Sequence, residues 1–476
     1  ALGEVPTLSV AEDLIDASLW VPRQFEELSA SNEDDLNAFR VDLARYLGDS
    51  GLTEVRFGAR YSEREKVFTQ KETSATTALV PDDPTLVLDD SFVRGIATPE
   101  NGPSYIAWDV NRLMSRFQSM IAQAPLPPPA GENSRLQQSG SIEEDSFSAY
   151  LQLDFDGQLG SVPVSGNLGV RYVDTDLVAP GWTTPDPATV PAIAIAPTHS
   201  YEEFLPSANL SFEFADTQIL RLGVGRVLNR APLDDMRSSE AIFISGFGAF
   251  GTAGNPQLDP TVADQVSLSY EWYPADATSL VLAAYYNDLD TFIGTVFEVV
   301  PVVPAGGGVP IDVIFQTLDN GEGGYIRGLE LAVNSTFGFL HDSLDSLGAS
   351  FNYALTESNV LPVAGAGQAA ALTGLSEDVA YLALWWARNN VEARVGFDYR
   401  SEYVEPGTFG DFLHVVDTLL TTFQISYDFS EDLRIGLFGR NIGDEQRRKY
   451  TANIPARTNF NVAFRETYGV KVFYRF

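Results

Sequence analysis

The chain has 476 residues, with 65 acidic and 30 basic side chains, for a formal net charge of −35 at pH 7. A chain this acidic repels a phosphate backbone, which argues against nucleic-acid binding. It has no cysteine, which is typical of an exported protein in an oxidising compartment. It also lacks any run of about 18 apolar residues, so the sequence predicts no transmembrane helix. Aromatic residues nevertheless make up 12% of the chain. This combination is typical of an all-β transmembrane barrel, in which half of each strand faces a wet lumen.

Segments with period-two alternation recur from residue 36 to the C-terminus, and we predict about fifteen antiparallel strands from them. Many exceed the usual length of about five or six residues, as tilted barrel strands must. The predicted strands are 36–47, 52–68, 145–156, 162–178, 200–214, 218–230, 262–273, 278–294, 324–338, 347–359, 376–388, 391–404, 412–429, 432–444 and 464–476.

The two faces of these strands differ in polarity. In residues 391–400, for example, apolar and polar side chains alternate strictly. A charge that faces lipid at mid-membrane costs about 2–4 kcal/mol, so we expect the polar set to face the lumen. Glycines recur on this face, where they either allow another protein element to approach closely or relieve the curvature of the barrel. The residues predicted to face the lumen or a plug are Arg56, Gly58, Arg60, Asn167, Arg171, Glu392, Arg394, Asp398 and Arg434.

The connections between strands alternate between two length classes. Short ones include 48–51, 215–217 and 389–390, whereas long ones include 69–144 and 231–261. This alternation is typical of an outer-membrane barrel with short periplasmic turns and long extracellular loops.

One helix is predicted, over residues 105–124 in the longest loop, from apolar residues at helical spacing. We expect it to pack on the loop region. The alternative is a lid that gates ligand entry.

Acidic pairs in the loops either keep the protein soluble or bind a divalent cation such as calcium. None of them has the spacing of a calcium-binding loop. With three histidines and no cysteine, the chain has few ligands for a transition metal, and we predict no cofactor. The candidate pairs and triplet are Asp82-Asp83, Asp89-Asp90, Glu143-Glu144-Asp145 and Asp234-Asp235.

The last predicted strand runs to Phe476, as expected for the strand that closes a barrel and ends in an aromatic residue. Fifteen strands cannot simply close, because bacterial single-chain barrels use even numbers. We therefore expect residues 1–35 to be the remnant of an extracellular loop and residues 36–476 to be the C-terminal part of a barrel. In a barrel of about 22 strands, roughly seven would precede this chain.

Five short segments resemble those of the TonB-dependent outer-membrane receptors, most closely their large proteobacterial branch. They are GNPQLDP at 254–260 followed by Ala263-Asp264, LPSANL at 205–210, the next strand LRLGVGRVLNRAP at 220–232, NGE at 320–322 with IRGLE at 326–330, and NIGD at 441–444. Taken together, the resemblance runs from about residue 36 to residue 476.

The resemblance implies a 22-stranded barrel, plugged by an N-terminal domain, in the outer membrane of a Gram-negative bacterium. It implies uptake of a scarce, bulky nutrient, such as a ferric siderophore, cobalamin or an oligosaccharide, powered by the TonB–ExbB–ExbD complex. Expected partners are outer-membrane lipid, lipopolysaccharide and a surface lipoprotein. The plug, the TonB-contacting segment and the early strands find no counterpart in this sequence.

We expect ligand binding at the lumen mouth, through aromatic side chains that stack on sugars or flat chelates and through arginines near the rim. The alternatives are an interfacial girdle or loop packing for the aromatics, and lipid phosphates for the arginines. The ligand-binding candidates are Trp182, Tyr201, Arg226, Arg230, Phe243, Phe247, Phe250, Phe409 and Phe412. The residues assigned a structural role are Gly254, Asn255, Pro256, Pro260, Asp264 and Phe476.

The sequence shows no nucleophile motif or catalytic triad, so we predict that the protein is not an enzyme. A barrel enzyme or adhesin is thereby disfavoured. A structural barrel that serves surface assembly, without autonomous transport, remains the alternative to an uptake receptor.

Overall fold

The computed structural model describes most of the chain. The described residues are 14–17, 20, 24–49, 51–76, 89–98, 103–123, 139–183, 193–245, 248–302, 309–361, 372–406, 412–451 and 458–475.

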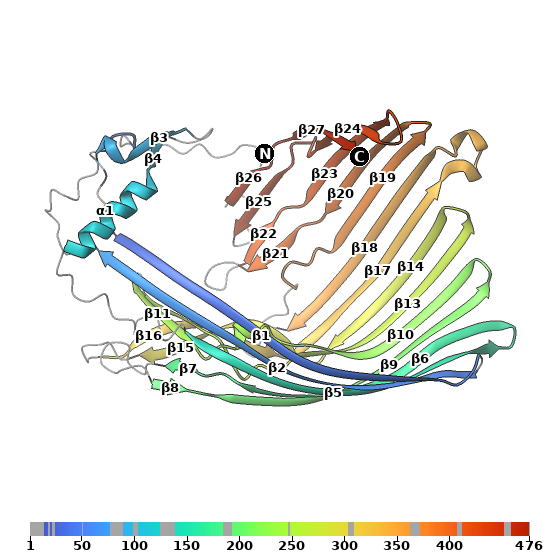
Figure 1. Ribbon diagram of the computed structural model, residues 1–476, viewed down its shortest axis with the longest axis horizontal. Coiled ribbons are helices and arrows are strands. Elements are labelled where there is room, and N and C mark those ends of the chain that lie inside the picture. Colours follow the sequence, from blue (N-terminus) through green and yellow to red (C-terminus); the bar gives the residue numbers. More distant parts are fainter. Residues whose placement is uncertain are drawn as a thin grey trace.

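One antiparallel sheet of fifteen strands dominates the fold and curves as a wall (Figure 1). Its strands follow one another in chain order, and each corresponds to one predicted strand, so the all-β barrel prediction is confirmed. In sheet order they are β1 (Gln24–Tyr46), β2 (Gly51–Thr76), β5 (Gly140–Leu159), β6 (Val162–Val178), β9 (Thr198–Ala215), β10 (Gln218–Asn229), β13 (Thr261–Ala275), β14 (Thr278–Leu289), β17 (Gly323–Thr336), β18 (Leu347–Leu361), β19 (Asp378–Arg388), β20 (Val391–Arg400), β23 (Thr418–Asp428), β24 (Leu433–Arg440) and β27 (Thr467–Tyr474).

Register keeps the apolar side chains of neighbouring strands on one side. Val395 of β20 lies opposite Phe423 of β23, whereas Gly396 lies opposite Thr422. The apolar side, which we call the outer face, carries large exposed side chains on most strands, such as Phe39 at 70% exposure and Ile425 at 47%. Exposure of this much apolar surface has a physical explanation only if lipid covers it.

A belt of carboxylates borders this apolar surface near the long-loop ends of β1, β2, β5, β6 and β9. Aromatic residues such as Phe39, Tyr61 and Phe147 form the row beneath it, and the Tyr61 hydroxyl donates a hydrogen bond to Glu63 at 3.0 Å. Since charges avoid hydrocarbon, the belt marks the level at which these strands leave the lipid. By register, its members are Glu33, Asp35, Glu63, Glu65, Glu143, Asp145, Asp174, Asp176 and Glu202.

Short turns gather at one end of the sheet and long connections at the other (Figure 1). Two of the predicted short turns, at 274–277 and 389–390, contain Ala277 and Asn389 in the left-handed region, at φ 58° and 55°. The predicted alternation of connection lengths is therefore confirmed.

The long connections contain small sheets of their own, which the sequence did not predict. Three predicted strands were too long because each breaks where the chain leaves the main sheet: 278–294 at Asp290, 391–404 at Ser401, and 412–429 at Val416. The segments beyond these breaks join the small sheets. One sheet contains β11 (Glu240–Ser245), β12 (Gly248–Ala253), β16 (Ile311–Gly321) and β15 (Phe292–Val302), and another contains β21 (Tyr403–Pro406), β22 (Phe412–Val415), β25 (Gln446–Thr451) and β26 (Thr458–Ala463). Two hairpins are β3 (Val93–Ala97) with β4 (Tyr105–Trp108), and β7 (Gly181–Thr183) with β8 (Ile193–Ile195).

The helix begins five residues later than the sequence predicted. Helix α1 spans Val110–Gln123, and the preceding residues 105–108 form strand β4. Asp109 sets the start, because its carboxylate accepts a hydrogen bond from the Arg112 backbone N–H at 3.1 Å. In the described part of the chain, the helices are too short or too polar to cross a membrane.

The two edges of the large sheet are β1 and β27. Strand β1 begins at Gln24, twelve residues before the predicted start at 36, so residues 24–35 belong to the strand rather than to a loop. Within the described residues, β1 pairs only with β2, and β27 pairs only with β24. Phe476 lies outside the described residues.

Candidate functional site

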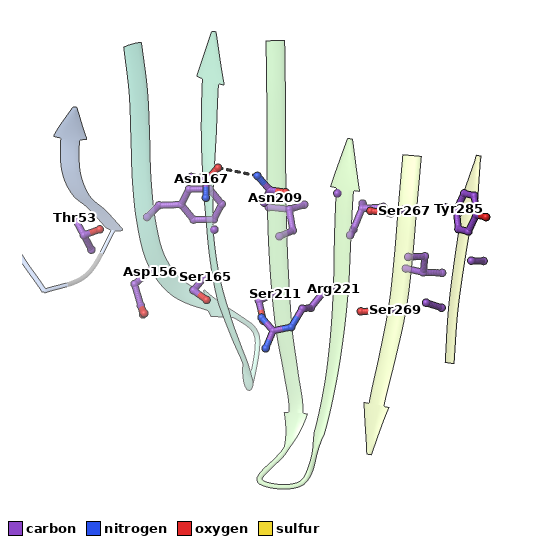
Figure 2. Close-up of a pocket in the computed structure, with 18 of the residues that line it drawn as sticks. Thr53, Asp156, Ser165, Asn167, Asn209, Ser211, Arg221, Ser267, Ser269 and Tyr285 are labelled. Atoms are coloured by element: carbon purple, nitrogen blue, oxygen red, sulfur yellow. Dashed lines mark hydrogen bonds between the residues drawn. The ribbon is translucent and has the colours of Figure 1, made fainter. Parts of the chain in front are cut away.

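The polar side of the sheet, which we call the inner face, carries a cavity of about 840 Å³ near the short turns. Figure 2 shows polar side chains from neighbouring strands lining it, with a hydrogen bond between the Asn209 and Asn167 amides, which is 3.0 Å long. The Arg221 guanidinium lies between Glu271, at 2.8 Å, and the Ser211 hydroxyl, at 3.2 Å. This wall is polar and rich in hydrogen-bonding groups, and it suits contact with polar protein surface or water.

The residues predicted to face the lumen share this inner face by register. Arg56 is paired with Glu54 and Asp154, and Arg434 with Asp428 and Glu392. The full set on this face is Arg56, Gly58, Arg60, Asn167, Arg171, Glu392, Arg394, Asp398 and Arg434.

The glycines of this face have a local explanation. A Cβ atom on Gly58 would lie 2.7 Å from both the Asp42 carboxylate and the Tyr150 ring, and one on Gly396 would lie 2.9 Å from the Thr422 hydroxyl. They therefore make room for side chains of neighbouring strands.

At the long-loop end, the connection between β10 and β13 folds over the inner face of β2, β5 and β6. Its 3-10 turn η5 (Leu233–Met236) inserts Leu233 and Met236 into a core with Phe68, Ile142 and Leu177. A salt bridge of 2.6 Å between Lys66 and Asp234 fixes it at the wall. The connection between β10 and β13 therefore covers part of the inner face at the long-loop end of the sheet.

Two asparagine side chains tie the GNP and NG motifs together. The Asn255 amide donates to the Leu318 carbonyl at 3.0 Å. The Asn320 amide donates to the Asp259 carbonyl and accepts from the Asp259 N–H, both at 2.9 Å. A Cβ on Gly254 would lie 2.3 Å from the Arg237 carbonyl oxygen, so only glycine fits there. These contacts support the structural role predicted for Gly254 and Asn255.

Both arginines predicted to bind ligand are occupied by carboxylates. Arg226 pairs with Asp264 at 3.1 Å and also contacts Asp290. Arg230 donates to Glu144 at 3.4 Å and to the Ser146 hydroxyl at 2.7 Å. Neither guanidinium offers an unpaired charge to an anionic ligand.

The aromatic candidates do not converge. Trp182 lies on the β7–β8 hairpin, Tyr201 is half-buried on β9 beside Arg230, and Phe412 lies on the sheet of β22. Phe250 lies on β12, opposite Phe243 of β11. Phe247 and Phe409 fall outside the described residues.

Ion pairs link the strands of the sheet formed by β21, β22, β25 and β26. Glu405 pairs with both Arg447 and Lys449, and the hydrogen bond from Lys449 lowers the pKa of the Glu405 carboxyl. On the same sheet, burial and a hydrogen bond to Glu402 raise the pKa of Tyr450 to about 12.

Among the described residues, no group of three or more histidine, aspartate or glutamate side chains could hold a metal ion. Two of the acidic candidates have structural partners instead: Asp89 accepts from the Ser91 N–H at 2.8 Å, and Asp234 pairs with Lys66. Asp82-Asp83 lies outside the described residues.

Sequence analysis missed a second cavity, of about 470 Å³, on the sheet of β11, β12, β15 and β16. It combines apolar side chains such as Phe315 and Val300 with the carboxylates of Glu240, Glu298 and Asp319. No sequence pattern marked it, because its residues come from two loops that lie about 40 residues or more apart in the chain.

Residues 12–442 match the model of a family described as TonB dependent receptor-like, beta-barrel. The chain belongs to this family. Membership confirms the predicted resemblance, the outer-membrane location in Gram-negative bacteria and the assignment to receptors rather than enzymes.

Solved receptors share the fold at low sequence identity. The ferric citrate transporter FecA in its unliganded form is 11% identical, with a TM-score of 0.57, and the match covers 94% of this chain and 55% of FecA. The siderophore receptor PiuA from Acinetobacter baumannii is 13% identical, with a TM-score of 0.54 over 93% of this chain and 56% of PiuA. A mutant of the ferric enterobactin receptor PfeA from Pseudomonas aeruginosa is 13% identical, with a TM-score of 0.50, and the match covers 95% of this chain and 67% of PfeA.

This chain therefore spans little more than half the length of FecA and PiuA. No curated protein sequence matches it.

The asparagine ties are testable in this receptor barrel. Replacing Asn320 by alanine removes three side-chain hydrogen bonds, two to the Asp259 backbone and one to the Thr291 hydroxyl, and leaves the Asp259 backbone groups unpaired. We expect the free energy of unfolding to fall by about 1–3 kcal/mol. Asn359→Ala is the matched control, because this exposed side chain hydrogen-bonds to none of the described residues. Equal effects of the two substitutions in a urea titration would refute the role of Asn320.

The ion pairs of Glu405 predict acid sensitivity of their sheet. The folded pKa lies below the ordinary value of 4.5, so the stabilisation is fully present above pH 4.5 and is lost as the pH falls through the folded pKa. Hydrogen exchange in β22 and β25, corrected for the intrinsic rate, should therefore lose protection in acid. Glu405→Gln should be less protected at pH 7 and should approach the native protein at low pH. A constant difference at all pH values would contradict this account.

Proposed function

We propose that this barrel is the outer-membrane part of a ligand-gated receptor that imports a scarce, bulky nutrient, with energy delivered through TonB–ExbB–ExbD. The polar inner face with its 840 Å³ cavity carries the proposal, in a chain that belongs to a TonB-dependent receptor family. An inner wall lined by amides, hydroxyls and paired charges suits a removable polar plug better than permanent packing.

The open edges of the sheet support a larger assembly. Backbone N–H and C=O groups left unpaired in lipid cost several kcal/mol each, and the outer edges of β1 and β27 have no partner among the described residues. We propose that further strands complete a barrel of about 22 strands, and that a plug domain docks on the inner face and contacts TonB.

For the substrate, ferric siderophores, cobalamin and oligosaccharides all have the size that requires a gated barrel. The similar structures are named for ferric citrate, ferric enterobactin and siderophores. At 11–13% identity they support the fold, so the three substrate classes stay open in this proposal.

The second candidate is a structural outer-membrane barrel that serves surface assembly. The same open edges favour it, since they could accept strands of another chain. Outer-membrane lipid, lipopolysaccharide and a surface lipoprotein are its proposed neighbours, as they are for the receptor.

Uptake can be tested in cells. We expect deletion of the gene to abolish growth on one limiting nutrient, and deletion of tonB to abolish the same growth. Induction of expression by iron starvation points to a chelate, and induction by a glycan points to a sugar. Growth and uptake that do not depend on the gene would contradict the receptor and favour the structural barrel.

A further inference from the structure

The inner face of β20, β23, β24 and β27, which are neighbours at one side of the wall, carries more cations than carboxylates (Figure 1). The whole chain has 65 acidic and 30 basic side chains, so this part of the wall reverses the balance. The outer face of the same four strands carries no charged residue within their bounds. By register, the inward cations and carboxylates are Arg394, Arg400, Arg434, Arg440 and Lys471, with Glu392, Asp398 and Asp428.

Two of the three carboxylates are already engaged by one arginine. Arg434 lies 2.5 Å from the Asp428 carboxylate and 3.4 Å from that of Glu392. The third carboxylate, Asp398, lies four residues along β20 from Arg394, a separation of about 13 Å in a strand. It is therefore too far away to pair with that guanidinium.

Three cations on this face have other contacts but no carboxylate. Arg394 donates to the Tyr381 hydroxyl oxygen at 2.6 Å. The guanidinium of Arg440 and the ammonium of Lys471 lie 5.5 Å and 5.0 Å from the centre of the Phe438 ring. Within the described part of the chain, none of the three cations forms an ion pair. Ring contacts and a hydroxyl orient a cation, but they leave its charge uncompensated.

The residues around these cations have the composition of a protein-binding surface. Trp385 lies opposite Arg394 on the inner face. Arginine and aromatic side chains are enriched where one protein surface docks on another. From β19 to β27 the set spans four strand spacings, or about 19 Å, which is wider than a small anion can contact. We call this set the basic wall patch, and its members are Arg394, Arg440, Lys471, Tyr381, Phe438 and Trp385.

A protein that covers the basic wall patch has to bring negative charge. Water solvates the cations while the wall is open, and Arg394 and Arg440 are exposed. A docked surface removes this water, and burial of a charge without a partner is costly. Carboxylates on the docked surface offset that cost, and they also disfavour other orientations of the partner.

We propose that the basic wall patch is the docking site of an acidic surface of the plug, whose aspartate or glutamate side chains pair with Arg394, Arg440 and Lys471. The inference rests on the proposed function, which supplies the plug. It deepens that function by naming the side of the wall that the plug binds and the charge of the plug surface that binds it.

Photo-crosslinking identifies what covers the basic wall patch. The full-length receptor in its own outer membrane carries p-benzoylphenylalanine in place of Gln424, which lies between Arg394 and Phe438. A second protein carries it in place of Ser207, an inner-face control between Gly169 and Gly225.

Mass spectrometry of the crosslinked peptides decides the outcome. We expect a plug segment rich in aspartate or glutamate at position 424 and a different plug segment at 207. A neutral or basic plug segment at 424 would overturn the proposal. So would a small anionic nutrient or lipopolysaccharide crosslinked there in place of the plug.

Charge variants measure the contribution of the cations. Arg440→Gln combined with Lys471→Gln should lower the docking equilibrium constant about tenfold, from about threefold for each exposed ion pair. The shift is read from the urea dependence of the crosslink at 424. Arg327→Gln is the matched control, because Arg327 lies on the outer face and pairs with Glu357.

Folding of each variant is checked first, by the electrophoretic mobility of the unboiled barrel. Arg440→Glu should weaken docking further, and lysine in place of the crosslinked plug carboxylate should restore it. An equal loss of docking in Arg327→Gln, or no loss in the double variant, would refute the docking site.

These results separate the docking site from the proposed function. A plug crosslink at 207 but none at 424 would retain the plug and reject this site. No plug crosslink at either position would reject the plug itself. An acidic plug segment at 424 without tonB-dependent growth would retain the docking site and reject import.

Discussion

Backbone hydrogen bonding in lipid is the constraint on which this structure depends. Water is absent from the bilayer core, so each N–H and C=O there needs a partner from the protein. The fifteen strands meet this demand by pairing in chain order, from β1 to β27, across an unbroken antiparallel sheet. The same pairing fixes register, and register decides which side chains meet lipid.

Register then separates two kinds of charge. Several carboxylates on the inner face are paired, as Asp34 is with Arg64 and Glu271 with Arg221. On the outer face, the first strands carry the carboxylate belt near the long loops, and Asp264, Asp288 and Glu357 face outward on later strands. The inner wall is thus a polar surface with many internal ion pairs. It is the surface on which we propose that a plug docks.

Local periodicity was enough to predict all fifteen wall strands and both faces, because the side chains of consecutive residues point to opposite faces of a strand. The loop sheets were missed because their pairing joins distant segments, such as β12 with β16. The ligand role assigned to Arg226 and Arg230 lacks support for a similar reason. Their carboxylate partners Asp290 and Glu144 lie 64 and 86 residues away in the chain, where spacing carries no signal.

The central claim is that β23 presents alternate side chains to lipid and to the inner face, and the absence of native cysteine makes it directly measurable. Single cysteines at Phe423, Gln424, Ile425 and Ser426 are spin-labelled in the membrane-embedded protein. Accessibility to oxygen, which dissolves in lipid, should be high at 423 and 425 and low at 424 and 426. Uniform accessibility, or the opposite phase, would contradict the assignment of the faces and the account built on it.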